Sequence, residues 1–265
     1  LPGVTADLLG VTDAHPASYR YPLILAGVLF LLTLPLVMST RYGASKRDEP
    51  AINPLANLSA APWRPIVSMS LVMFLSSVGV GVTISFFNVY LDDGLSVTTA
   101  VIGTVTAATQ LVASPASLLM PIVAARLGYA RGFSWSRMIM ALGLIPIALI
   151  PTLYAATAAM LIMASAAAIS QQVFTLFSQS VVTDRWRSLM SGVTNTVMGA
   201  GWALTALAGG HVIKHWGYPT IFLIGSGATI LTVVVFVAVA RHLQEDDAQD
   251  PERLDTEQPV AGSAT

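Results

Sequence analysis

Seven long apolar stretches constrain this chain more than any other feature of its sequence. They lie at approximately 22–40, 65–91, 99–125, 134–151, 153–181, 188–213 and 218–240. A hydrocarbon layer about 30 Å thick is crossed by a helix of roughly 20 apolar residues. One such stretch could form the core helix of a soluble protein, but seven in succession leave no polar segment to cover them. The sequence therefore predicts an all-α membrane protein, a multi-helix transmembrane bundle.

The charge content supports the same fold class. Charged residues make up only 10% of the chain, whereas soluble domains contain about 25%. So few charges cannot build a water-facing surface, so we expect most of the surface to face lipid. The net charge of −1 provides no basic face, and we expect no nucleic-acid partner. The absence of cysteine excludes thiolate catalysis and Cys-ligated metals.

The basic residues predict the orientation of the helices. If the first helix runs from outside to inside, 11 of the 13 Lys and Arg residues fall on the cytoplasmic side, as the positive-inside rule requires. The outer side then holds only Arg20 and Lys214. We therefore expect a cytoplasmic C-terminus. The cytoplasmic set is Arg41, Lys46, Arg47, Arg64, Arg126, Arg131, Arg137, Arg185, Arg187, Arg241 and Arg253.

Polar segments divide the chain into five parts. Residues 1–21 are predicted to be the remnant of an outer loop, and 22–40 a transmembrane helix of a preceding half. Residues 41–64 contain Lys, Arg, Asp, Glu and three prolines, which favours a cytoplasmic linker between two bundles. Residues 65–240 are predicted to form a six-helix transmembrane bundle. The acidic segment 241–265 has the composition of a disordered cytoplasmic tail.

Two segments of the bundle resemble each other at an offset of 89 residues. The matched pairs are Val123/Val212, Gly128/Gly217, Tyr129/Tyr218, Phe133/Phe222 and, further upstream, Gly103/Gly192. The first group of three helices in the bundle would start on the cytoplasmic side of the membrane, and the second group of three would start on the outer side. The pattern predicts a 3+3 inverted repeat, the usual build of secondary transporters, whose substrate site lies near mid-membrane. A coincidental match between two helices that end in glycine is the alternative.

Three motifs occur in order along the chain. The first reads Pro121-x-x-x-Ala125-Arg126-x-Gly128-x-x-Arg131. The second reads Phe86-Phe87-Asn88-Val89-Tyr90-Leu91, followed by Gly94 and Ser96, and the third is Asp184-Arg185 followed by Ser191-Gly192 and Asn195. Together they resemble the major facilitator superfamily. The first is similar to the family's loop motif Gly-x-x-x-Asp-Arg-x-Gly-x-x-Arg, with Pro121 and Ala125 replacing the first glycine and the acid.

The resemblance implies a twelve-helix secondary transporter, either a permease or an exporter. This chain would supply the sixth to twelfth helices. Its partners would be the lipid bilayer, a missing N-terminal six-helix half and a small-molecule substrate. The short loops and Ala-rich helices favour a bacterial inner membrane. The resemblance also implies a gating loop made of Arg126, Gly128, Arg131, Asp184 and Arg185.

Ionisable residues are sparse within the predicted helices. All 14 Asp and Glu residues fall in loops, in the tail or at helix ends, and we place no Lys or Arg at mid-membrane. Intramembrane carboxylates are the usual proton relays. If transport is proton-coupled, the coupling carboxylate is therefore expected in the missing half. A wall without formal charge favours a neutral or amphipathic substrate. We expect no cofactor and no metal.

Uncharged polar side chains remain as candidates for the substrate pathway. Gln171 and Thr175 are four residues apart on one helix face, and Asn195 and Trp202 are seven apart on another. The same side chains could instead hold helices together, at about 0.6 kcal/mol each, and both interpretations stay open. The run Gly199-Ala200-Gly201 favours close helix packing. The full set of pathway candidates is Asn88, Gln110, Gln171, Gln172, Thr175, Asn195 and Trp202.

Two other classes of membrane protein are weighed against a transporter. A seven-helix receptor fits the helix count, but the chain lacks a Cys pair, an Asp-Arg-Tyr after the third helix, and both an Asn-Pro-x-x-Tyr and a Lys in the seventh. A non-transporting assembly protein would need no polar stripes. The helices contain no catalytic constellation, so an enzyme is not expected.

Overall fold

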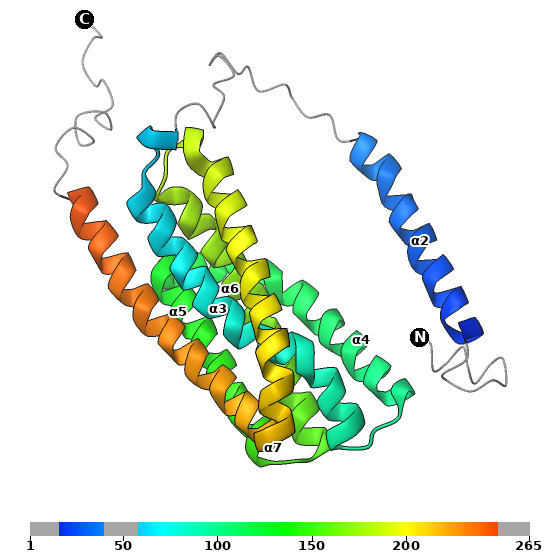
Figure 1. The fold of residues 1–265 in the computed structure, drawn as a ribbon. Helices are drawn as coiled ribbons and strands as arrows, with labels where there is room; N and C mark the ends of the chain where they lie inside the picture. The colour runs from blue at the N-terminus through cyan, green and yellow to red at the C-terminus, as the bar shows by residue number, and fades with distance from the viewer. Residues whose placement is uncertain (1–15, 40–57, 249–265) are drawn as a thin grey trace, which may run out of the picture.

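The computed structural model describes residues 16–39 and 58–248, and it describes side chains within 23–35, at 38 and within 58–242. These residues form helices and short connections, with no strand among them (Figure 1). The all-helical fold predicted by the sequence is confirmed over these ranges. The helices are α2 (Pro16–Ser39), α3 (Trp63–Val89), α4 (Thr99–Ala116), α5 (Met120–Leu149), α6 (Leu153–Ser180) and α7 (Arg187–Ala248). Short helical turns lie at Leu58–Ala60, Tyr90–Gly94, Ser117–Leu119 and Asp184–Trp186.

Two glycines break the longest helices. Gly128 in α5 has φ 74° and ψ 165°, and Gly217 in α7 has φ 77° and ψ 176°. Side chains with a Cβ disfavour a positive φ, so glycine is the residue that permits these breaks. Beyond Gly217 the chain turns back, and the end of α7 runs antiparallel to its beginning (Figure 1). We call 187–216 the first span of α7 and 218–248 its second span.

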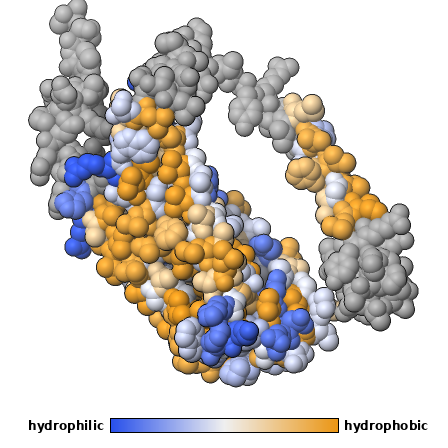
Figure 2. Space-filling model, in the orientation of Figure 1, coloured by the Kyte–Doolittle hydropathy of each residue, from blue (hydrophilic) through white to orange (hydrophobic). Residues whose placement is uncertain are grey.

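The helices of the bundle from α3 to α7 contain segments long and apolar enough to cross a membrane. Four segments meet this criterion by length and composition: Trp63–Gly94, Thr99–Leu149, Leu153–Ser180 and Asp184–His242. The second and the fourth each contain one of the glycine breaks and so comprise two spans. The second span of α5 is 129–149. On the face that Figure 2 shows, hydrophobic side chains dominate the middle of the bundle and hydrophilic ones gather toward its ends.

Helix α3 packs closely against both spans of α7. A Cβ on Gly201 would collide with the Ser77 side chain, and one on Gly79 would collide with that of Thr229. A Cβ on Gly225 would lie 3.1 Å from the Cβ of Val82. Because glycine has no side chain, α3 and the two spans of α7 pack closely against each other, as helices with small residues do in membranes. The predicted packing role is confirmed for Gly201.

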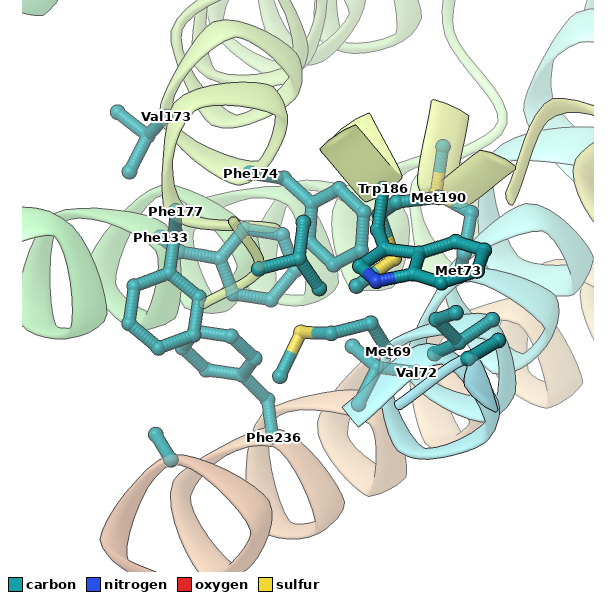
Figure 3. Close-up of a cluster of buried hydrophobic side chains, with 14 residues drawn as sticks. Met69, Val72, Met73, Phe133, Val173, Phe174, Phe177, Trp186, Met190 and Phe236 are labelled. Carbon is teal, nitrogen blue, oxygen red and sulfur yellow. The ribbon is translucent and has the colours of Figure 1, made fainter. Parts of the chain in front are cut away.

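Buried residues form two cores. The first centres on Phe133, Phe174, Phe177 and Phe236, with ring centroids 4.4 to 5.5 Å apart (Figure 3). It includes Trp186 and so lies toward the end of the bundle where α7 begins. The second core gathers Tyr90, Leu91, Ile147, Ala148 and Phe222, from the far ends of α3 and α5 and the start of the second span of α7. The two cores mark the two ends of the bundle.

Several predicted segments lie wholly or partly outside the described residues. These include most of the outer loop remnant at 1–21, most of the linker at 41–64 and most of the tail at 241–265. Helix α7 extends past the predicted tail boundary to Ala248. The sequence from Arg241 to Ala248 explains this extension, because it contains mostly good helix formers.

Candidate functional site

The first span of α7 exposes small and polar side chains along one face. The exposed residues recur every three or four positions, which is the helical repeat. A Cβ added to Gly192, Gly199 or Gly210 would meet no atom within 4 Å. The face is therefore open in the described bundle. Its small or polar members are Gly192, Asn195, Thr196, Gly199, Ala200, Ala203, Ala206 and Gly210, and we call them the small-residue face.

The second span of α7 exposes mainly large apolar side chains, whereas the first span exposes such side chains only at Leu204, Leu207 and Trp216. In the second span, the exposed residues include Leu223, Ile224, Ile230, Leu231 and Val234, which are all large and apolar. Such side chains suit contact with lipid tails. Small residues instead mark the places where helices approach other protein in membranes. The small-residue face is therefore the better candidate for contact with protein or a substrate pathway.

Two pathway candidates lie at the junction of α3 and α4. Asn88 is exposed near the end of α3, and its Oδ1 accepts a hydrogen bond of 3.4 Å from the Thr106 hydroxyl of α4. Gln110 is also exposed, one turn further along α4 on the side of Thr106. The structure thus brings Asn88 to the polar side of α4. Thr106 was not among the predicted candidates.

The candidates on α6 point in different directions. Gln171 and Thr175 are half-buried, and the Thr175 hydroxyl donates to the Gln171 carbonyl oxygen at 2.9 Å. Gln172 is exposed. Further along, Gln179 Nε2 donates to the Ser191 hydroxyl at 3.3 Å and links α6 to α7. The α6 candidates therefore do not form one cluster.

Asn195 and Trp202 share a face of α7 but differ in environment. Asn195 is exposed, whereas Trp202 is half-buried and its indole N–H has no acceptor among the described residues. Gly201, beside Trp202, packs against α3. Asn195 is thus the candidate on the small-residue face, and Trp202 lies where that face meets the buried side.

The predicted gating residues lie at one end of the bundle. Gly128 makes the turn within α5, and Arg126 and Arg131 are exposed on either side of it. Asp184 pairs with Arg187 at 3.0 Å, and Arg187 Nε also donates to the Gln179 carbonyl oxygen at 3.3 Å. Arg187 was missed as a site residue.

Arg185, which was predicted, lies over the Trp186 ring with its Cζ 5.1 Å from the centroid. The spacing of three residues between Asp184 and Arg187 was the signal that could have identified the observed ion pair.

Arg137 corrects the sequence analysis. The prediction counted it with the cytoplasmic loops and placed no Lys or Arg at mid-membrane. Its side chain is only 2% exposed, within the second span of α5. The error came from starting this span at 134, where the apolar run begins. The helix resumes directly after Gly128, which places Arg137 more than two turns inside it.

The opposite end of the bundle has its own polar contacts. The Tyr218 hydroxyl donates to Asp93 Oδ2 at 2.9 Å, linking the end of α3 to the second span of α7. The Tyr90 and Tyr218 rings lie 5.4 Å apart. The rings of His211 and His215 are 4.1 Å apart on the first span. The two tyrosine contacts tie the end of α3 to the second span of α7, whereas the histidine pair lies within one helix.

Comparison with known proteins identifies one family. The model of the family described as Major Facilitator Superfamily matches residues 69–262, which is more than half of the chain. No curated protein matches the chain significantly.

Proposed function

The chain belongs to the Major Facilitator Superfamily, and we propose that its six-span bundle is the C-terminal half of a twelve-helix transporter for a small neutral or amphipathic molecule. Members of this family are transporters and not enzymes, so the chain is a multi-pass secondary membrane transporter. In such proteins two halves rock about a central site in alternating access. The bundle would form one wall of that site.

The small-residue face of α7 is the observation that supports this proposal most. It is open in the described bundle and includes Asn195 and Thr196 among residues without bulk. An amide facing lipid would be costly, whereas contact with a second half or a substrate would satisfy it. Asn88 and Gln110 add exposed amides on α3 and α4. A receptor or an assembly protein would not require this arrangement.

The distribution of charge supports a substrate without formal charge. Among the described residues, Asp92, Asp93 and Asp184 lie at the ends of spans. Arg137 lies within a span but is buried away from the exposed faces. The proposed wall therefore offers amides and small residues to the substrate. A coupling carboxylate, if transport is proton-coupled, belongs to the N-terminal half.

The backbone supports the inverted 3+3 repeat as part of this proposal. Gly128 and Gly217, which match at the offset of 89, have nearly the same φ and ψ. Phe133 and Phe222, also matched, are both fully buried, but in cores at opposite ends of the bundle. Related residues at opposite ends are what inverted topology requires.

The orientation belongs to the proposal as well. With Arg137 moved into a span, ten basic residues remain on the proposed cytoplasmic side against two outside. The positive-inside rule then favours a cytoplasmic C-terminus in a bacterial inner membrane. A protease-accessible tag fused to the C-terminus would be cut only in inside-out vesicles. Cleavage in intact, right-side-out cells would contradict this orientation.

Transport by alanine variants tests the pathway. Membrane vesicles are offered a panel of neutral and amphipathic compounds, and the rate for any compound that the wild type moves is measured in both directions. Asn195→Ala and Gln171→Ala should lower the rate several-fold at unchanged protein level. Thr220→Ala, which removes a polar group from the second span of α7 and outside the small-residue face, is the control. Normal rates in both variants would remove Asn195 and Gln171 from the pathway.

The mass of the natural polypeptide tests the half-transporter proposal separately. A value near twice the 27.9 kDa of this chain, or somewhat less, is expected if five or six helices precede it. A value equal to this chain would mean that the bundle works without a second half in the same polypeptide, as an obligate dimer would.

A further inference from the structure

We propose that Arg137 is the centre of a buried site for a small inorganic anion inside the bundle. Arg137 lies nine residues after Gly128 in the second span of α5. At about 1.5 Å of rise per residue, it is about 14 Å from that turn and within the depth of the hydrocarbon layer. An ionisable residue at this depth is a functional-site hypothesis by default. The proposal does not depend on the identity of the transported substrate.

The surroundings of the guanidinium are apolar. Its Cζ lies 5.2 Å from the centroid of the Phe133 ring, and Nη1 lies 3.7 Å from Met140 Sδ. Its Nε is buried and has no hydrogen-bond partner among the described residues. A ring face and a thioether are weak partners for a full positive charge, and an arginine does not lose its proton in a protein. The charge therefore needs an anion.

The described carboxylates do not supply that anion. Asp184 pairs with Arg187 at the start of α7. Asp93 accepts a hydrogen bond from Tyr218 at the other end of the bundle, and Asp92 is its neighbour there. Each is at a span end, whereas Arg137 is inside a span. Within the described part of the chain, the guanidinium is thus a buried cation without a carboxylate.

Helix register places a second unpartnered donor at the depth of Arg137. Between α5 and α6, a Cβ on Gly132 would lie 3.8 Å from Val173, and Gly143 approaches the side chain of Met163. The helices are antiparallel, so the position opposite 137 is close to Ser170. The Ser170 side chain is fully buried, and its hydroxyl has no partner among the described residues.

A third donor lies at the same depth on α3. Two contacts fix the register between α5 and the second span of α7: the Phe133 and Phe236 rings are 4.4 Å apart, and the Ser226 hydroxyl donates to the Ala141 carbonyl oxygen. Because the two helices are antiparallel, Arg137, which is halfway between 133 and 141, lies at the depth of residues 230–232. Gly79 of α3 lies against Thr229, and α3 is antiparallel to the second span of α7. Ser76, three residues before Gly79, is therefore at about the depth of residue 232. The Ser76 hydroxyl is also buried without a partner in the described structure.

These hydroxyls differ from most others in the bundle. Thr194, Thr205 and Thr229 each donate to the carbonyl oxygen four residues earlier. Ser76 and Ser170 do not, so their donors remain available inside the bundle. A guanidinium and two hydroxyls offer donors that require an acceptor. The buried guanidinium, with these two hydroxyls at its depth, selects an anion, and its 2% exposure favours a small one such as chloride.

Anion-dependent thermal stability tests the site. The purified full-length protein is unfolded by heat in detergent, in sodium chloride and in sodium gluconate of equal ionic strength. Chloride is expected to raise the Tm by about 5 °C, because a ligand that binds only the folded state stabilises it. Equal Tm values in the two salts would overturn the proposal and would indicate that a carboxylate outside the described residues partners Arg137.

Arg137→Met separates the site from a general salt effect. An apolar side chain of similar size in place of an uncompensated buried charge is neutral or stabilising. This variant should therefore fold, match or exceed the wild-type Tm in gluconate, and lose the chloride response. Arg131→Met, which removes an exposed arginine from the same helix, should retain the response. A chloride response that survives in Arg137→Met would overturn the proposal.

Ser170→Ala tests the contribution of the hydroxyl. It should show a smaller rise in Tm than the wild type at each chloride concentration, and several-fold more chloride should be needed for the same rise. An unchanged chloride requirement would remove Ser170 from the site and leave Arg137 as its centre.

Discussion

The two spans of α7 are continuous in sequence, but they expose different chemistry. Both pack against α3 through small residues, Gly201 in the first span and Gly225 in the second. Outward, the first span presents mainly glycine, alanine, asparagine and threonine, with Leu204 and Leu207 as larger members, and the second presents mainly leucine, isoleucine and valine. Hydropathy identifies a membrane span, but the size of the exposed side chains indicates whether it faces lipid or protein.

The largest expected effect distinguishes the buried and exposed sides of the first span. Gly201→Leu should abolish accumulation of folded protein, because even a Cβ at this position would collide with Ser77 and lie 3.3 Å from the Phe74 carbonyl oxygen. Gly199→Leu should fold normally, because a Cβ there meets nothing within 4 Å. Size-exclusion profiles of the two variants in detergent check this. Equal profiles would show that α3 and α7 do not pack as described.

The next effect compares the exposed sides of the two spans. Gly199 and Gly227 both face open space, one in each span. Gly199→Leu should lower transport at least tenfold, because it adds bulk to the proposed contact with substrate or the second half. Gly227→Leu should transport normally, because it adds an apolar side chain to a face that already consists of such side chains. Transport rates at matched protein levels provide the test, and equal losses would contradict the distinction between the faces.

The smallest effect concerns the ion pair that begins the first span. The Asp184 and Arg187 side chains are 87% and 48% exposed, and exposed pairs contribute about 0.2 to 1 kcal/mol. Asp184→Asn should therefore lower the Tm by no more than about 3 °C. A large loss of thermal stability would mean that the pair has partners outside the described residues.

Periodicity and charge content were sufficient to predict the fold class. The apolar runs located the spans because lipid demands continuous apolar length, and the gaps between runs contained Gly128 and Gly217, where the structure has its breaks. The boundary at 134 was wrong because the helix resumes after Gly128 with residues that are not strongly apolar. That single shift hid the burial of Arg137.

Side-chain environments were harder to predict because they depend on which helices are neighbours. Gln171 and Gln172 are adjacent in sequence but differ in exposure, as do Gly199 and Gly201. Sequence spacing indicates which residues share a helix face, but not whether α3, lipid or a second half covers that face. Thr106 was missed for the same reason, since its partner Asn88 lies on another helix, as does the Gln179 partner of Arg187.

Water accessibility of the two exposed faces tests the central claim most directly. The chain contains no cysteine, so Gly199→Cys and Gly227→Cys each introduce one thiol into it. The two variants are treated in native membranes with a membrane-impermeant maleimide, with any cysteines elsewhere in the full polypeptide replaced. Labelling at 199 that changes when substrate is added, with none at 227, is the predicted result. Labelling at neither position, or equally at both, would contradict the assignment of the first span to the transport pathway.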